Sequence, residues 1–272
     1  MLGAMIGDIA GSLYEFNNYR RKDFPMLSER CFFTDDTVMT AAVANVCRTL
    51  YKPGEPIEEE LWRTALTQEM QRMGRAYPGR GYGGRFGRWL YDAEPKPYHS
   101  WGNGSAMRVS PVSFIAGSLA ECRTLARLTA EPTHDHPEGI AGAECAACAG
   151  YMALHGAGRE EIRRFVEENY YKLDFTIDGI RETYSFNETC RDTVPQAIEA
   201  FLESTDFEDA IRLAVSVGGD SDTLAAITGG IAEAFYGIPE KWEARSLAFL
   251  TPELREIVNG FRAFKKTLRH KV

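Results

Sequence analysis

Two short acidic segments of the chain carry the residue types that bind hard metal ions. Residues 218–223 (GGDSDT) place two carboxylates and a hydroxyl close together, on a loop that two glycines leave free to bend. Residues 34–37 (TDDT) repeat the combination of threonine and aspartate. Each segment directly precedes an apolar helical pattern. Residues 218–223 come before a helix expected over residues 224–236, and residues 34–37 come before one expected over residues 38–50. Although they are far apart in the sequence, the two segments can meet in space as halves of one site.

Charge gives the physical reason to pair the two segments. Like charges crowded into one site raise one another's pKa and destabilise the folded chain, and two divalent cations would cancel the charge of the four aspartates. Oxygen ligands suit Mg²⁺, Mn²⁺ or Ca²⁺, whereas Zn²⁺ favours histidine and cysteine. The alternative is helix capping, because Asp and Thr are preferred N-cap residues. Two aspartate-rich caps, one of them preceded by glycines, favour a metal site with ligands from Thr34, Asp35, Asp36, Asp220, Asp222 and Thr223.

The elements that must hold these segments are predicted to be helices. Glycine recurs every fourth residue at Gly3, Gly7 and Gly11, and a row of glycines on one helix face indicates that another backbone packs very close. That helix is expected to end near Glu15, whose carboxylate would face either a cavity or solvent. Because period-two alternation is almost absent, we expect an all-α fold. Further helices are predicted over residues 56–73, 138–154 and 252–268, and from a capping box at residues 205–208 onward.

Three other stretches have residues suited to binding a substrate. Residues 77–85 are too rich in glycine for regular structure, and exposed backbone amides beside arginines suit a phosphate or diphosphate. This loop fits neither a Walker nor a dinucleotide-binding pattern. Residues 101–108 predict a tight turn that opens a helix, which is either an anion or sugar-hydroxyl site or an ordinary Asn-Gly turn. His134 and His136 lack the other ligands of a zinc pattern, so we interpret His134 as a substrate contact and His136 as structural.

Composition argues against several classes of protein. The 272 residues, 44% of them hydrophobic, predict one compact domain over residues 1–272. A net charge of -8 argues against a nucleic-acid or membrane surface as the main partner, since those attract basic patches. We expect no signal peptide and no membrane span, because a basic leader and a long apolar run are both missing. Six scattered cysteines favour reduced thiols in a cytoplasm, and we interpret the pair Cys145 and Cys148 as helix packing.

Six motifs, taken in order, resemble those of the ADP-ribosylglycohydrolase family. They are GDIAGSLYE at residues 7–15, TDDT at 34–37, RGYG at 80–83, GNGSAMR at 102–108, TH at 133–134 and GGDSDT at 218–223. The likeness covers nearly the whole chain. It implies an all-α, compact orthogonal helical bundle that holds two divalent cations, Mg²⁺ or Mn²⁺. It also implies an enzyme that hydrolyses the glycosidic bond between the distal ribose of ADP-ribose and an arginine or serine side chain.

The resemblance further implies roles for individual residues. The six ligands named above would hold the metals, and Glu15 would be a mobile carboxylate beside them. Cleavage at the anomeric carbon passes through an oxocarbenium-like transition state, so a positioned water is needed, and Glu15 or Asp35 is the candidate to orient it. The partner would be ADP-ribose on a modified protein or in a small free conjugate, bound by a monomer. The substrate-binding residues would be Gly81, Gly83, Gly84, Asn103, Gly104, Ser105 and His134.

Three other functions compete with hydrolysis. Glycosyltransferases also use Asp-x-Asp to hold a metal, but they need an α/β nucleotide domain whose strand pattern is missing here. A non-catalytic ADP-ribose-binding module would have no evident need for Glu15. A purely structural cation site predicts stabilisation by metal without any ligand binding.

Overall fold

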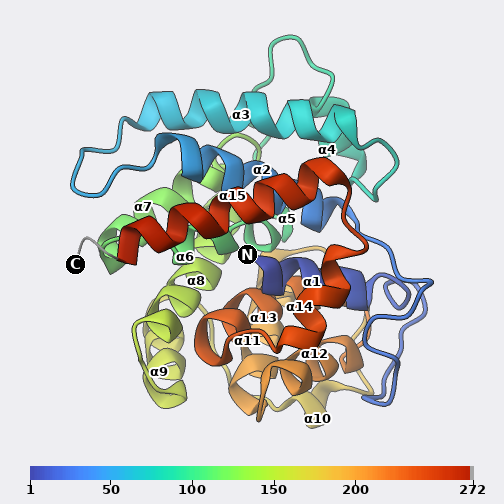
Figure 1. The fold of residues 1–272 in the computed structure, drawn as a ribbon. Helices are drawn as coiled ribbons and strands as arrows, with labels where there is room; N and C mark the ends of the chain where they lie inside the picture. Colours follow the sequence, from blue (N-terminus) through green and yellow to red (C-terminus); the bar gives the residue numbers. More distant parts are fainter. Residues whose placement is uncertain (270–272) are drawn as a thin grey trace.

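Helices make up the regular structure of this computed structural model, which describes residues 1–269 (Figure 1). Within those residues the β pairing consists of one isolated antiparallel bridge between Gly102 and Thr189. The prediction of an all-α fold is therefore confirmed. In chain order the elements are α1 (Leu2–Gly11), α2 (Asp35–Leu50), α3 (Glu59–Ala76), α4 (Gly84–Trp89), α5 (Gly104–Met107), α6 (Ser110–Ser113), α7 (Leu119–Ala130), α8 (Pro137–Leu154), α9 (Arg159–Asn169), α10 (Ile177–Ile180), η1 (Cys190–Asp192), α11 (Val194–Glu203), α12 (Phe207–Ser216), α13 (Ser221–Tyr236), α14 (Glu240–Leu247) and α15 (Pro252–Arg269).

Helices α1 and α13 pack against each other with their backbones in contact. A Cβ atom on Gly7 would lie 1.9 Å from the carbonyl oxygen of Ala225, and one on Gly3 would lie 2.2 Å from that of Gly229. The close approach predicted from the glycine spacing is therefore confirmed. All ten residues of α1 are buried, so this helix lies in the interior of the molecule.

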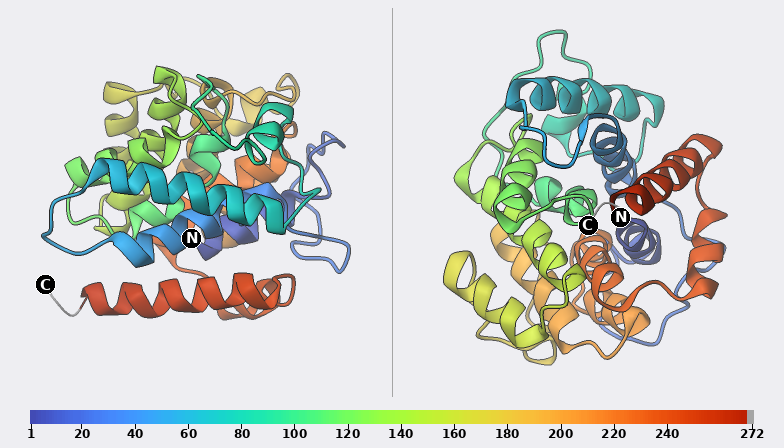
Figure 2. Two further views of the ribbon diagram at one scale, coloured as in Figure 1. Left: turned by 90° about the horizontal axis from the view of Figure 1, so that it is seen from above. Right: turned by 60° about the vertical axis from the view of Figure 1, so that its left-hand side comes forward.

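The remaining helices surround this central pair. Helices α8, α11 and α12 pack on α13, while α3 and α15 pack on α2. Figure 2 shows α15 as an outer layer on one side of the molecule. Because α2 and α13 both begin close to α1, the starts of these two helices are brought to the same place.

Local details correct or confirm several predictions. The expected capping box at residues 205–208 is displaced by one position: Asp206 caps α12 by accepting from the N–H of Asp209, whose own carboxylate accepts from the N–H of Thr205. The first helix ends at Gly11, before Glu15. His136 has the predicted structural role, because its Nδ1 accepts from the N–H of Glu138 at the start of α8.

Cysteine pairing and membrane spans were also predicted from the sequence. All six cysteines are unpaired and buried, and Cys145 and Cys148 pack inside α8 as expected. Among residues 1–269 no helix combines the length and apolar character that crossing a bilayer would require.

Candidate functional site

A buried carboxylate on α1 organises the start of α2. Asp8 is fully buried, and its two oxygens accept from the N–H groups of Thr34 and Thr37 at 3.0 Å each and from the Thr34 hydroxyl at 2.7 Å. The same Thr34 oxygen caps α2 by accepting from the N–H of Asp36. These bonds fix the first turn of α2 against α1, so the carboxylates of that turn are held in place. The sequence motif contained Asp8, but its role had not been predicted.

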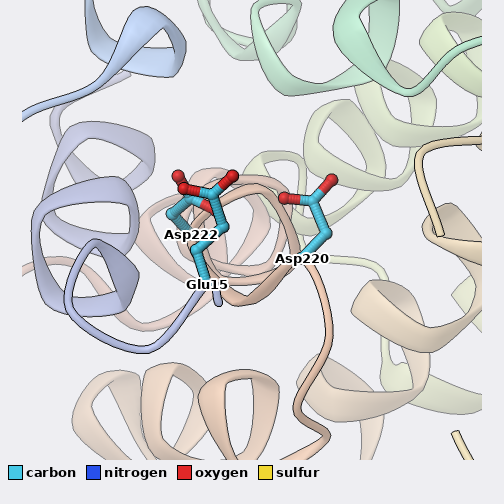
Figure 3. Close-up of side chains that lie close together, drawn as sticks. All are labelled: Glu15, Asp220 and Asp222. Atoms are coloured by element: carbon cyan, nitrogen blue, oxygen red, sulfur yellow. The ribbon is translucent and has the colours of Figure 1, made fainter. Parts of the chain in front are cut away.

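The two acidic segments do meet, as their composition suggested they could. Thr223, at the start of α13, donates its hydroxyl to Asp36 Oδ2 at 3.3 Å, across 187 positions of sequence. Carboxylate oxygens of Glu15, Asp220 and Asp222 all lie within 4.8 Å of one another (Figure 3). Figure 3 shows Glu15 reaching these aspartates from the segment that follows α1. The starts of two helices and one connecting segment therefore form a single acidic cluster.

Crowding and burial change the protonation of this cluster. Burial, and then the charge of Asp222, raises the pKa of Asp35 and of Asp36 well above the usual range of a carboxyl. The same two causes raise the pKa of Glu15 to about 8. Burial raises the pKa of Asp220 to about 7. Each shift has the sign expected for acidic groups that lack a compensating positive charge.

The cluster fits divalent cations on the chemistry of its donors. Asp36 is 2% exposed, and within residues 1–269 its Oδ1 has no hydrogen-bond partner. A buried, unpartnered carboxylate oxygen is costly unless a cation satisfies it. The donors that surround it are carboxylate and hydroxyl oxygens, which suit Mg²⁺ or Mn²⁺. The residues present are therefore compatible with a metal centre.

The cluster forms one wall of a cleft of about 250 Å³. The glycine-rich loop forms a second wall beside the acidic one, and its backbone contacts the acidic cluster because the Asp35 N–H donates to the Arg80 carbonyl at 2.8 Å. Gly81 has a φ of +99° and a Cβ there would lie 3.1 Å from Asp35 Oδ1, so this position favours glycine. The predicted residues that line the cleft are Glu15, Asp35, Asp36, Gly81, Gly83, Gly84, Asn103, Gly104, His134, Asp220, Asp222 and Thr223.

Two predicted substrate residues have bonds within the protein. Asn103 uses its side-chain amide to donate to Asp220 Oδ2 at 2.6 Å, which orients a carboxylate of the cluster. Ser105 is fully buried, and its hydroxyl donates to the Gly139 carbonyl at 2.6 Å. The Ser105 side chain thus joins α5 to α8.

Several residues of the cleft had not been predicted from the sequence. Arg85, Tyr98, Arg108 and Glu188 all line it. Arg85 and Arg108 lie within motifs that had been singled out, so their positions carried a signal. Glu188 comes from a stretch with no readable motif, and only the fold brings it beside the acidic cluster.

Comparisons with known proteins identify relatives of this chain. ADP-ribosylhydrolase ARH3 of Mus musculus is 26% identical, over 89% of this chain and 85% of its own. ADP-ribosylarginine hydrolase Tri1 of Pseudomonas putida is 25% identical, over 89% of this chain and 71% of its own. ADP-ribosyl-[dinitrogen reductase] glycohydrolase of Rhodospirillum rubrum is 29% identical, over 60% of this chain and 56% of its own.

A solved structure described as an ADP-ribosylglycohydrolase-related protein complex superposes with a TM-score of 0.71 and 25% identity, covering 97% of this chain and 95% of that one. The fold, the acidic cleft and these relatives define the protein as a glycosidase-type hydrolase. The sequence model of the family described as ADP-ribosylglycohydrolase matches residues 1–269. The chain belongs to the ADP-ribosylglycohydrolase family.

Proposed function

We propose that this protein is a metal-dependent ADP-ribosyl hydrolase. It would cleave the glycosidic bond between the distal ribose of ADP-ribose and a modified protein side chain, with small free ADP-ribosyl conjugates as the alternative substrate. The observation that carries the proposal is the buried acidic cluster, with its unpartnered Asp36 oxygen, at the wall of a cleft. A structural cation site would not need to open onto such a cleft.

Two divalent cations, Mg²⁺ or Mn²⁺, would complete the acidic wall. When bound, they would offset the carboxylate charges and polarise the ribose hydroxyls. The residues that would hold them are Thr34, Asp35, Asp36, Asp220, Asp222 and Thr223.

The protein's own groups would do the remaining work. Glu15 is half-buried at the edge of the acidic wall, where its carboxylate can orient a water and take its proton during attack on the anomeric carbon. Asp35 is the alternative for this role, since it also lines the cleft. Asn103 would keep Asp220 in position through its 2.6 Å hydrogen bond.

The wall formed by the glycine-rich loop suits the diphosphate of the substrate. Gly81, Gly83 and Gly84 line it and have no side chains to obstruct contact between their backbone and an anion. Arg85 adds a positive charge on the same wall, where its guanidinium donates to the Tyr98 carbonyl at 2.9 Å. We propose that one chain suffices for activity, because these residues all belong to it. Six unpaired cysteines favour a reducing compartment such as the cytoplasm.

Release of ADP-ribose in a metal-dependent manner tests the proposal. Peptides ADP-ribosylated on arginine or on serine, and a small free ADP-riboside, are incubated with the protein in Mg²⁺, in Mn²⁺ or in chelator. We expect release of free ADP-ribose with either metal and a loss of more than about a hundredfold with chelator. If no substrate is cleaved while ADP-ribose still raises the melting temperature, the protein is a binding module.

An exposed aromatic pair beside the acidic wall favours arginine as the modified side chain. The rings of Phe16 and Phe186 stack with centroids 5.9 Å apart, and Phe16 is 81% exposed. Phe16 directly follows Glu15, and Phe186 lies two positions before Glu188. Those two carboxylates line the cleft and form no ion pair within residues 1–269. In an ADP-ribosyl group the leaving side chain and the diphosphate occupy opposite ends of the ribose. We propose that a diphosphate held by the glycine-rich loop places the leaving group near this aromatic and acidic rim, which suits a planar cation.

Removing both rings should lower arginine selectivity. For Phe16→Ala/Phe186→Ala we expect kcat/KM for an arginine-linked peptide to fall about tenfold, because a guanidinium stacked on an aromatic ring gains ~0.5–2 kcal/mol. The value for a matched serine-linked peptide should change less than about twofold. Leu61→Ala, at an exposed apolar side chain on α3, is the control and should affect neither. An equal loss for the two linkages would show that the rings do not select the substrate.

A further inference from the structure

The His134 ring is held by a hydrogen-bonded chain that starts at a buried arginine. Arg108 is 1% exposed, and its Nη2 donates to the hydroxyl oxygen of Thr133 at 2.9 Å. The Thr133 hydroxyl in turn lies 2.7 Å from Nδ1 of His134. The same guanidinium also donates to the carbonyl of Thr129 at 2.8 Å, which fixes its position against the end of α7.

Counting hydrogens along this chain assigns the proton of the histidine ring. An arginine can only donate, so the Thr133 oxygen accepts from it and must place its own hydrogen elsewhere. Thr133 is fully buried, and in the described part of the chain the one partner of its hydroxyl besides the Arg108 donor is His134 Nδ1. A buried hydroxyl without an acceptor is costly. The Thr133 hydroxyl therefore donates to Nδ1, and Nδ1 carries no proton.

The other ring nitrogen faces the cleft. A Cβ atom on Gly102 would lie 3.4 Å from His134 Nε2, and one on Gly104 would lie 3.2 Å from it. Because both residues are glycines, the space in front of this nitrogen is open. His134 is 5% exposed and lines the cleft. Across residues 1–269 no group forms a hydrogen bond to Nε2. A polar atom in this position is available to a ligand.

We infer that Thr133 and Arg108 hold His134 as its neutral Nε2–H tautomer, so that Nε2 donates a hydrogen bond to an oxygen of the bound ADP-ribosyl group. Thr133 and Arg108 are positioning residues, since they act through His134. The identity of the ligand rests on the proposed function, whereas the tautomer follows from the hydrogen-bonded chain alone.

The surroundings keep the ring neutral. Burial lowers the pKa of His134 well below its usual value, and the charge of Arg108 lowers it further. Tyr98, a neutral phenol, also faces the ring, with its ring centroid 6.1 Å away. No carboxylate among the described residues forms an ion pair with His134. An uncharged donor therefore persists across neutral pH.

The tautomer can be tested in the ligand-free protein. Histidine is labelled with ¹⁵N, and long-range proton–nitrogen spectra are recorded between about pH 6 and 8, with His134→Gln identifying the resonances. We expect a pyrrole-like Nε2 and a pyridine-like Nδ1 over this range. Thr133→Val, which keeps the shape but removes the hydroxyl, should abolish that pattern, and Thr133→Ser should restore it. A pyrrole-like Nδ1 in the native protein overturns the tautomer, and an unchanged pattern in Thr133→Val overturns the role of Thr133 in holding it.

Binding of free ADP-ribose tests the role of the donor. For Thr133→Val and His134→Gln we expect Kd to rise about tenfold, because a net hydrogen bond contributes ~0.5–1.5 kcal/mol and the unpaired partner adds to the loss. Thr133→Ser should bind like the native protein, and melting temperatures show whether each variant folds. Unchanged affinity in both variants overturns the donor role. If the native protein does not bind ADP-ribose at all, the proposed function fails while the tautomer assignment stands.

Discussion

Replacing Asp36 with asparagine is expected to abolish ADP-ribosyl hydrolysis while making the metal-free protein more stable. Asparagine keeps the shape of the side chain but removes a buried negative charge beside Asp35, Asp220 and Asp222, all of which raise its pKa. Activity should fall by at least about a thousandfold, because the cations would lose a ligand whose charge holds them. Without metal, each kcal/mol of relieved repulsion should raise the melting temperature by about 2–4 °C.

The two effects of Asp36→Asn distinguish a metal ligand from a merely structural residue. Melting temperatures are measured in chelator and in saturating Mg²⁺, together with turnover of the preferred substrate. The native protein should gain stability on adding Mg²⁺, and the variant should gain little. Asp23→Asn, at a side chain that is 72% exposed, is the control and should behave like the native protein. A lower melting temperature of Asp36→Asn in chelator would contradict the proposed repulsion.

The stability of the native protein in chelator should also depend on pH in a defined direction. The folded-state pKa values of Asp8 and Asp220 are raised to about 6 and about 7, while in the unfolded chain an aspartate titrates near its ordinary value of about 4. The folded protein therefore binds more protons in this window, so its stability falls as pH rises from about 4 to about 7. Melting temperatures recorded at several pH values in chelator measure this fall, which should be smaller with Mg²⁺ present.

A single added methyl group between α1 and α13 is expected to have the second large effect. In Gly7→Ala the new Cβ would lie 1.9 Å from the Ala225 carbonyl oxygen, a backbone atom that cannot rotate away. The two helices must separate, at a cost of about 3 kcal/mol or more in the free energy of unfolding. Because Asp8 follows Gly7 and Asp222 lies on α13, activity should fall as well.

Urea denaturation of Gly7→Ala measures this cost. Gly87→Ala is the matched control: Gly87 lies inside α4, where an added Cβ would be 4.0 Å from its nearest neighbour, the Tyr82 side chain. In that open position alanine should be neutral or stabilise the helix by up to ~1 kcal/mol. If both variants unfold at the same urea concentration, the contact between α1 and α13 is less rigid than the structure indicates.

How far the sequence predicts the fold depends on whether its signals are local. The glycine spacing of α1 and the apolar periods of α2 and α13 are local, so the helices and the close approach at Gly7 could be predicted. The two acidic segments could also be recognised, because clustered carboxylates repel one another and need cations to offset their charge, whatever their separation in the sequence. The capping box was misplaced by one residue, because Thr205 and Asp206 are both good caps. The hydrogen bonds that Asp209 forms with these two residues in the folded protein make Asp206 the cap.

Long-range contacts could not be predicted in this way. The bonds from Asp8 to Thr34 and Thr37 span 26 and 29 positions, and nothing local to Asp8 indicates them. Asn103 lines the cleft as a predicted substrate contact, but the bond by which its side chain orients Asp220, 117 positions away, was not predicted. Glu188 lines the cleft in a segment that is held against the Asn103 turn, where its backbone carbonyl accepts from the Asn103 N–H at 2.7 Å. Such roles depend on tertiary packing.

The contact between α1 and α13 also constrains the order in which the protein folds. It joins residues such as Gly3 and Glu233, which are 230 positions apart. During synthesis α1 leaves the ribosome before its partner helix, which ends at Tyr236. Closing so long a loop is slow compared with forming local contacts. An apolar helix that is fully buried in the folded protein therefore remains without its partner until α13 has been made, and the nascent chain is vulnerable to aggregation until then.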